Sequence, residues 1–438
     1  MLEIIKQIFT NPKVLFRETP RILFPEKRLS WLDLNKKKWL KILQNKGCIG
    51  IEFCEQSKEE YLYKIDIDKT NYKNTNYRGV NLYSALLYDI CVEAEVFATA
   101  VDYGDLKHKE IINKIFMKGA AYIDYISKLI IDTKPNAFVN LHGNILESSI
   151  IRAIALQKNI PGLTLENTLN KTKILWNYDK GYVNSCSNLG MIFYNNYKDL
   201  VSSRKAKRYV KKYFNNICSM KSGQHISGNE IVTIKNKKPT IVFLGQVYTD
   251  SSVLFGLYPG FKTPEALISA LVDYALSMEC NIIIKMHPKE FLGCNPVNSK
   301  RYDELTWRKI NSDSLLMEKI HKYDSIYIDH KNALDTLSLI DIADVVVTIN
   351  SQAGLEALAR GKETILCGMS FYEDLGTTFN ASNFDMLAHF LKLVLIKKES
   401  LIDHDKICKF FYIYFEKYCC RKGEVDLFNL LKNRLLQN

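Results

Sequence analysis

One segment of the sequence places polar side chains directly after an apolar run, in an order suited to holding an anion. Within residues 343–362, the apolar run ends in Asn350 and Ser351, and Gly354 and Glu356 follow. Ser is a favoured N-cap, and a helix N-terminus offers free backbone N–H groups and a partial positive charge. Gly354 would allow a phosphate close approach, and Glu356 could accept hydrogen bonds from ribose hydroxyls. An ordinary capped helix fits the same residues.

A second apolar run ends in a His-Pro pair. His287 and Pro288 follow residues 282–286, and proline disfavours helical geometry at the residue before it, so His287 is expected at a strand tip. There the imidazole can donate a hydrogen bond to a phosphate, with Lys285 and Lys289 adding positive charge. A lone histidine is often structural, and that alternative stays open.

Two acidic residues follow further apolar runs. Asp250 comes shortly after the run at 241–244 and could serve as a nucleophile or a base, or simply cap the next turn. Glu166 ends the run at 162–165 and could act on an acceptor as an acid or base. No Asp-x-Asp follows a strand, so no divalent metal site is expected.

The elements that would position these residues alternate between strands and helices. Such alternation predicts doubly wound parallel sheets, in which ligands bind beyond the carboxyl ends of the strands. The expected strands are 48–53, 137–141, 162–165, 240–247, 281–286, 325–328, 345–349 and 364–367. The expected helices are 31–45, 82–133 with a break near Gly104, 148–158, 264–278, 314–323, 333–342 and 352–360, with a helical C-terminal end.

The length of 438 residues exceeds one compact core and predicts two domains. Residues 215–238, rich in Asn, Ser, Gly and Lys, are the expected linker. We therefore expect an N-terminal domain at 1–220, a C-terminal domain at 239–400 and a helical segment at 401–438. The ligand would bind in the cleft between two such domains.

The formal net charge of +12 indicates an anionic partner. Basic clusters at 36–38 and 204–212 alternate with apolar residues, which suits either solvated faces or a membrane surface. No zinc-finger, RNP-like or recognition-helix pattern occurs, so nucleic acid ranks last. Eleven scattered cysteines, no signal peptide and no apolar stretch of about 20 residues predict a cytoplasmic protein, soluble or peripheral on the inner membrane face.

Taken in order, these segments resemble the bacterial capsule polysaccharide biosynthesis and export family, which includes β-Kdo transferases. The resemblance covers roughly residues 135–380. The motifs that carry it are Glu166-Asn167 with Trp176 and Gly181-x-Val183-Asn184, Gly245-Gln246-Val247-x-x-Asp250-x-Ser252, His287-Pro288, Asn350-Ser351-x-x-Gly354-x-Glu356, and Gly368-x-x-Phe371-Tyr372.

The resemblance implies a GT-B fold of two Rossmann-like domains facing a cleft, no metal or other cofactor, and a CMP-activated acidic sugar such as CMP-Kdo as donor. It implies that Asp250 forms or supports a glycosyl intermediate and that Glu356 binds the ribose. The implied phosphate site is His287, Pro288, Asn350, Ser351 and Gly354. The implied cleft residues are Gln246, Ser252, Lys285 and Tyr372.

The expected function is glycosyl transfer in capsule or surface polysaccharide synthesis, from a nucleotide sugar to a lipid-linked or polysaccharide acceptor. Capsule assembly proteins and the inner membrane are further expected partners. Two alternatives stay open: a sialyltransferase-like enzyme on the same fold, and a non-catalytic capsule assembly or export factor.

Overall fold

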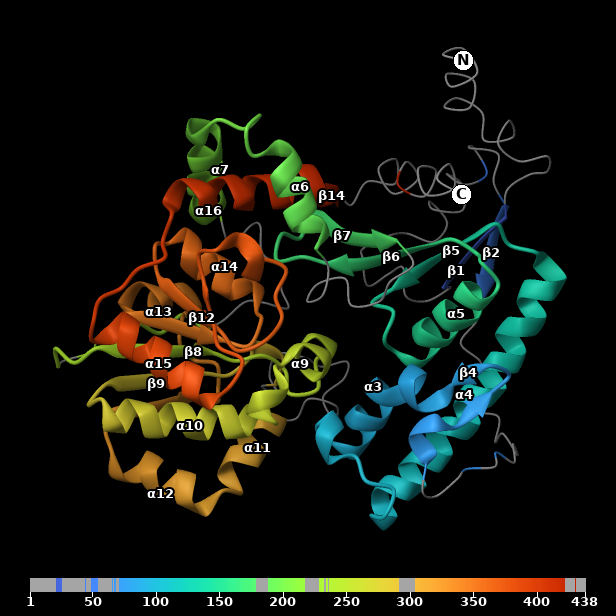
Figure 1. Ribbon diagram of the computed structural model, residues 1–438, viewed down its shortest axis with the longest axis horizontal. Helices are drawn as coiled ribbons and strands as arrows, with labels where there is room; N and C mark the ends of the chain where they lie inside the picture. Colours follow the sequence, from blue (N-terminus) through green and yellow to red (C-terminus); the bar gives the residue numbers. More distant parts are fainter. Residues whose placement is uncertain are drawn as a thin grey trace. The chain divides into compact units, whose positions relative to one another are not determined.

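The computed structural model describes residues 21–25, 44, 49–53, 65, 67, 71–178, 188–216, 228–231, 234, 236–290, 304–421 and 430 (Figure 1). These residues form two compact units. The first unit contains the described residues within 1–168, 172–183 and 419–438, and the second those within 169–171 and 184–418. Within these ranges, no helix combines the length and apolar character needed to cross a bilayer.

The second unit is built on a parallel sheet whose strand order reverses in its middle. Its described strands lie in the order β10-β9-β8-β11-β12-β13, and each pair is parallel. When the six strands are numbered from 1 to 6 along the chain, their order across the sheet is 3-2-1-4-5-6. Rossmann dinucleotide-binding sheets have this order, and their ligands bind where the order reverses. That point lies between β8 and β11. The strands are β8 (Thr240–Leu244), β9 (Asn281–Lys285), β10 (Ile326–Asp329), β11 (Val345–Thr348), β12 (Glu363–Leu366) and β13 (Phe379–Asn380).

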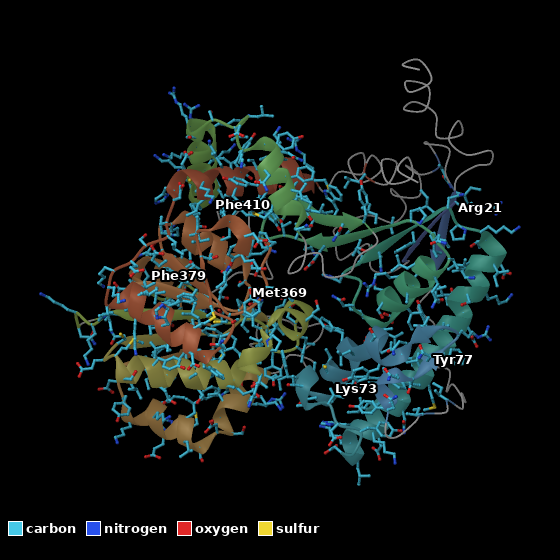
Figure 2. The ribbon with its side chains drawn as sticks, viewed as in Figure 1. Arg21, Lys73, Tyr77, Met369, Phe379 and Phe410 are labelled. Atoms are coloured by element: carbon cyan, nitrogen blue, oxygen red, sulfur yellow. The ribbon has the colours of Figure 1, made fainter. Side chains whose placement is uncertain are left out.

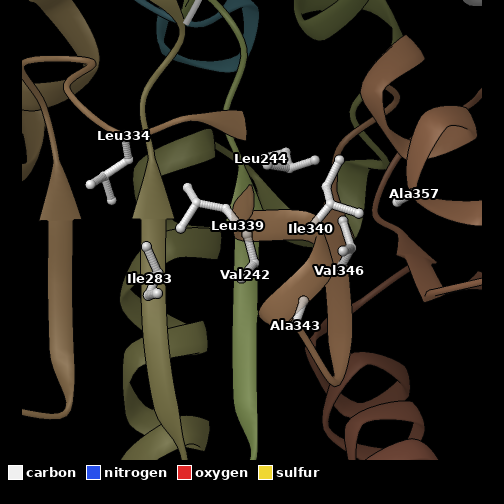
Figure 3. Packing of buried hydrophobic residues seen from close by; sticks show 9 residues of the cluster. All are labelled: Val242, Leu244, Ile283, Leu334, Leu339, Ile340, Ala343, Val346 and Ala357. Carbon is white, nitrogen blue, oxygen red and sulfur yellow. The ribbon is translucent and has the colours of Figure 1, made fainter. Parts of the chain in front are cut away.

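Both faces of this sheet are covered, which explains why its strands are apolar throughout rather than alternating. Val242 and Leu244 of β8 belong to the cluster in Figure 3, with Leu339 and Ile340 of helix α13 packed on them. The alternate residues of β8, such as Phe243, point to the other face and are also buried.

The helices of the second unit begin at well-defined caps. Thr263 caps α10, Asp335 caps α13 and Asn383 caps α15, and each side chain accepts a hydrogen bond from a first-turn N–H. The helical elements that accompany the sheet are α9 (Ser251–Gly256), η6 (Pro259–Phe261), α10 (Pro264–Ser277), η7 (Pro288–Glu290), α11 (Leu305–Asn311), α12 (Ser314–Lys322), α13 (Thr336–Ile342), α14 (Gln352–Ala359), η9 (Glu373–Leu375) and α15 (Phe384–Leu395).

An aromatic cluster joins helices from distant parts of the chain within the second unit. The helices are α6 (Leu189–Tyr197), α7 (Ser203–Asn215) and α16 (His404–Ile413), the last continuing as the π-helix η10 (Tyr414–Tyr418). Phe410 of α16, labelled in Figure 2, has its ring 5.7 Å from that of Tyr194. Tyr213 of α7 has its ring 5.0 Å from that of Phe411. These contacts fix α6 and α7 to the second unit.

The first unit contains a mixed sheet with helices α3, α4 and α5. Its strands lie in the order β14-β7-β6-β5-β1-β2; the pairs from β6 to β2 are parallel, whereas β7 and β14 add antiparallel pairs. The elements are β1 (Arg21–Pro25), β2 (Ile49–Phe53), η3 (Tyr72–Asn74), β3 (Asn76–Tyr77), β4 (Val80–Asn81), α3 (Leu82–Ala94), η4 (Ala98–Ala100), α4 (Leu106–Thr133), β5 (Ala137–Leu141), α5 (Leu146–Gln157), β6 (Gly162–Asn167), β7 (Lys173–Tyr178) and β14 (Cys420–Arg421).

The α/β class and the two Rossmann-type units expected of a GT-B fold are confirmed, as is the helical break near Gly104. The expected helix at 31–45 lies outside the described residues apart from position 44. The predicted domain boundary at 220 is wrong, since α6 and α7 pack on α16 in the second unit. Nor is the C-terminal end one helical segment: α16 belongs to the second unit, and β14 joins the first unit's sheet.

Candidate functional site

Three predicted site residues follow neighbouring strands of the second unit's sheet. Asp250 follows β8, His287 follows β9 and Ser351 follows β11. Because β9-β8-β11 are adjacent and parallel, their carboxyl ends lie at one edge of the sheet. The fold therefore brings these three loops to the edge at which open parallel sheets bind ligands.

A network of amide hydrogen bonds joins the two strand ends at the reversal point. The Gln246 Nε2 donates to Asn350 Oδ1 at 2.8 Å, and the Asn350 backbone N–H donates to Gln246 Oε1 at 3.0 Å. Asn350 Nδ2 also donates to the Ser252 carbonyl at 2.7 Å, and Gln246 Nε2 contacts Ser252 Oγ at 3.2 Å. These bonds set the spacing between the loop after β8 and the loop after β11.

Ser351 is the N-cap of α14, as the sequence predicts. Its hydroxyl accepts a hydrogen bond from the Ala353 N–H at 3.1 Å, and the side chain is half-buried. The backbone N–H groups of Ser351 and Gln352 have no hydrogen-bond partner among the described residues. Two donors and the positive end of a helix dipole are thus present at the same edge, which suits an anion.

Gly354 makes room for a neighbouring aromatic side chain. A Cβ at this position would lie 2.2 Å from the Tyr372 hydroxyl oxygen, so glycine is needed to admit that ring. Tyr372 is fully buried, and its hydroxyl donates to the Ser351 carbonyl at 2.6 Å. Burial raises the pKa of the Tyr372 hydroxyl. Both residues support the loop that carries Ser351, and the close approach of a phosphate to Gly354 stays a prediction.

The prediction for Glu356 is corrected. Its side chain is 0% exposed, and its Oε1 accepts a hydrogen bond from the Tyr213 hydroxyl at 2.8 Å. Burial, together with the neighbouring Glu356 carboxylate, raises the pKa of Tyr213. Glu356 faces inward from the second turn of α14 and connects that helix to α7, so it is closed to a ribose in this structure.

His287 is held in one tautomer by a local hydrogen bond. The Lys289 backbone N–H donates to His287 Nδ1 at 3.1 Å. This bond requires an unprotonated Nδ1, so the ring proton of the neutral imidazole lies on Nε2. His287, Pro288 and Lys289 are all half-buried. The histidine thus has the protonation pattern of a hydrogen-bond donor through Nε2.

Lys285 does not face a ligand. The side chain is 3% exposed, and its Nζ forms an ion pair with Asp329 Oδ2 at 2.8 Å and a hydrogen bond with Asn332 Oδ1. Asp329 also accepts backbone N–H groups of Ala333 and Leu334 at 2.8 and 3.0 Å. The predicted role of Lys285 in neutralising a donor sugar is therefore wrong: its charge is neutralised internally.

Glu290 is a residue whose role the sequence did not reveal. It is 3% exposed and accepts hydrogen bonds from the Tyr248 N–H at 2.7 Å and from the Thr306 hydroxyl at 2.8 Å. Burial raises the pKa of Glu290 to about 7, against the lowering effect of these bonds. The carboxylate joins the loops after β8 and β9 to the first turn of α11. Only its position, three residues after His287, could have indicated it.

Asp250 caps a short helix while keeping a partly exposed carboxylate. Its Oδ1 accepts the Ser252 N–H at 2.8 Å, which makes it the N-cap of α9, and the residue is half-buried. The capping alternative raised by the sequence is thus present. It leaves a chemical role open, since capping uses one carboxylate oxygen.

The strand-end residues of the first unit form a separate group. Glu166 Oε1 lies 3.8 Å from His142 Nδ1, with side-chain exposures of 20% and 31%. His142 has a left-handed backbone conformation with φ of 58°, uncommon outside glycine. Trp176, on β7, is buried. The motif residues 181, 183 and 184 lie outside the described residues, and no group of three or more His, Cys, Asp or Glu suited to a metal occurs among the described ones.

A family model matches the part of the chain that contains the loops after β8, β9 and β11. Residues 190–389 match the family model described as "Capsule polysaccharide biosynthesis protein". The matched stretch is similar to that family, and it covers less than half of the chain. The matched residues include α7 and the strands β8 to β13, and therefore Asp250, His287 and Ser351. Glu166 and His142 lie before them.

Solved structures are similar at low identity. The Thermosulfurimonas dismutans KpsC beta Kdo 2,4 transferase is 14% identical, with a TM-score of 0.43 over 69% of this chain and 87% of that one. The beta Kdo 2,7 transferase of the same organism is 14% identical, with a TM-score of 0.40 over 70% and 89%. Methanocaldococcus jannaschii UDP-GlcNAc 2-epimerase is 12% identical, with a TM-score of 0.32 over 89% and 97%. No curated protein matches this sequence.

Proposed function

We propose that this chain is a glycosyltransferase of capsular or surface polysaccharide synthesis. The donor is a CMP-activated acidic sugar, Kdo by the resemblance of the motifs, and the acceptor is lipid-linked or a growing polysaccharide. The observation that carries the proposal is the reversal point between β8 and β11, which lies within the residues that match the capsule polysaccharide family model. There Asp250, Ser351 and, one strand away, His287 follow adjacent strand ends.

The chemistry follows from the groups at that edge. The Asp250 carboxylate attacks the anomeric carbon, the bond from that carbon to the phosphate oxygen breaks, and CMP leaves with the electron pair. The Nε2–H of His287 and the free N–H groups at the start of α14 stabilise the charge on the leaving phosphate. An acceptor hydroxyl then displaces Asp250 and gives its proton to a general base. No metal is required, because the CMP-sugar carries few negative charges and the protein supplies hydrogen-bond donors to its phosphate.

Two variants of Asp250 separate its chemistry from its capping role. Asp and Asn are about equally good N-caps, so Asp250→Asn preserves α9 while removing the nucleophile; Asp250→Ala removes both. We expect Asp250→Asn to lower release of CMP from CMP-Kdo by about 10²–10⁴-fold with unchanged CMP binding. Unchanged turnover would remove Asp250 from the mechanism.

Ligand binding tests the nucleotide class independently of turnover. A nucleotide present at about 100 times its Kd should stabilise the protein by about 2.7 kcal/mol. We expect this stabilisation with CMP and not with UDP, measured by thermal unfolding. Stabilisation by UDP alone would redirect the donor assignment, and stabilisation by neither nucleotide would favour a non-catalytic assembly factor.

A further inference from the structure

Helix α7 carries a concentrated positive charge that the proposed reaction does not use. Residues 188–216 contain seven Lys or Arg against one acidic residue, Asp199, so this short segment has a net charge of +6, half of the chain's +12. The helix itself contains no Asp or Glu. Its basic residues are all exposed: Arg204, Lys205, Lys207, Arg208, Lys211 and Lys212.

Packing turns this basic face outward. The opposite side of α7 is buried through Ala206, Val210 and Tyr213, against α16. Neighbouring groups neutralise little of the charge: Lys207 lies 4.0 Å from Asp405, and Lys205 lies over the Tyr412 ring at 5.2 Å. The remaining four basic side chains have no hydrogen bond or ion pair within the part of the chain that the structure describes; they are Arg204, Arg208, Lys211 and Lys212.

Apolar groups accompany the cations. Leu200, two residues before the cap of α7, is 77% exposed, and Ile192 of α6 is 43% exposed. A groove of about 390 Å³ beside α7 is lined by apolar residues that include Val210 and Phe214, by the basic Lys207, Lys211 and Arg360, and by one acidic residue, Asp341, which pairs with Arg360. Exposed aliphatic side chains next to cations are typical of surfaces that lie in the lipid headgroup region.

We propose that this face of α7, with Leu200 at its N-terminal end, docks on the surface of an anionic lipid bilayer. Positive charge matches the negative potential of such a leaflet, and Leu200 enters the boundary between headgroups and acyl chains. A nucleic-acid backbone would pair with the cations but would provide no apolar environment for Leu200. The proposal is independent of glycosyl transfer, and it explains how a chain could meet a lipid-linked acceptor.

Co-sedimentation with vesicles tests the proposal without any sugar donor. The full chain is mixed with vesicles of phosphatidylcholine alone or of phosphatidylcholine and phosphatidylglycerol. We expect binding only to the mixed vesicles, weakened as the Debye length falls from about 30 Å to about 8 Å between 0.01 and 0.15 M salt. In the triple variant Arg208→Gln, Lys211→Gln, Lys212→Gln the partition coefficient should fall about 100-fold.

A charge-matched control separates this face from net charge. The variant Lys107→Gln, Lys114→Gln, Lys118→Gln removes three exposed lysines from α4 in the first unit and should retain nearly all binding. Leu200→Ser should weaken binding several-fold at the higher salt, where electrostatics is screened. The proposal is overturned by equal binding to both vesicles, by equal losses in the two triple variants, or by binding of an RNA oligonucleotide without binding of vesicles. Unchanged thermal unfolding shows that each variant is folded.

Discussion

The loops after β9 and β11 lie at the same edge of one sheet but are stabilised by different kinds of interaction. The loop after β9 is stabilised by buried ionisable groups, which are the Lys285–Asp329 ion pair and the Glu290 carboxylate. After β11 the stabilising groups are uncharged, namely Asn350, the Ser351 cap and buried Tyr372. Charged groups lose far more solvation on burial than neutral ones, so the β9 end depends on each of its partners.

The difference also shows where this edge can attract an anion. The charge of Lys285 is neutralised by Asp329 and therefore contributes little to the attraction of an anion from solvent. Among the described residues of the second unit's sheet edge, the groups that can attract an anion include half-buried Lys289, the Nε2–H of His287 and the N-terminus of α14. The β9 end should therefore be the more sensitive to mutation and to pH, and the β11 end the more tolerant.

The largest effect is expected at the buried ion pair. Asp329→Ala leaves the Lys285 ammonium buried without a countercharge and removes the acceptor of two backbone N–H groups. We expect the free energy of unfolding of the second unit to fall by about 3–5 kcal/mol, measured by urea denaturation. Lys285→Met with Asp329→Asn should recover part of that loss, because asparagine keeps an acceptor for a backbone N–H group and no charge is left buried. A loss below about 1 kcal/mol in the single variant would contradict an obligatory pair.

The next effect is a pH dependence at Glu290. Its folded-state pKa of about 7 lies above the ordinary value of 4.5, so the folded state binds this proton more tightly than the unfolded state. The resulting stabilisation is full below about pH 4.5 and is lost as pH rises through 7, a change of about 3 kcal/mol. Glu290→Gln, which does not titrate, should lack this slope. Parallel stability–pH curves for the two proteins would refute the assignment.

A smaller effect is expected at Gly354. Its size distinguishes a packing role beside Tyr372 from a role in making room for a phosphate. If glycine is needed to admit the Tyr372 hydroxyl, Gly354→Ala should destabilise by about 1–3 kcal/mol through overpacking. Tyr372→Phe removes that hydroxyl, so the double variant should be more stable than the sum of the single changes predicts. If Gly354 instead makes room for a phosphate, stability would be kept and nucleotide affinity lost.

The smallest effect is expected at the Ser351 cap. Ser351→Ala removes the acceptor of the Ala353 N–H and should cost about 1 kcal/mol, with Ser351→Asn retaining the cap. Thermal unfolding measures the loss. A cost as large as that of Asp329→Ala would overturn the contrast between the charged and uncharged ends.

The sequence predicted the strand ends well because each apolar run stops at a loop with distinct chemistry. It placed Asp250, His287 and Ser351 after separate strands. Because these strands are parallel neighbours in the sheet, the three loops lie at the same edge. The sequence misjudged Lys285 and Glu356 because a charged residue near a strand end suits a ligand or an internal partner equally. The domain boundary failed because the aromatic contacts of α7 with α16 join segments about 200 residues apart.

By itself, the sequence determined the α/β class, the alternation of elements and the caps at Asp250 and Ser351, because periodicity and capping depend on residues a few positions apart. Only the tertiary structure decided which polar groups face inward. Asp329 lies 44 residues from Lys285, and Tyr213 lies 143 residues from Glu356. Such pairs form because a buried charge or hydroxyl must find a partner wherever the fold provides one, and no local pattern records that partner.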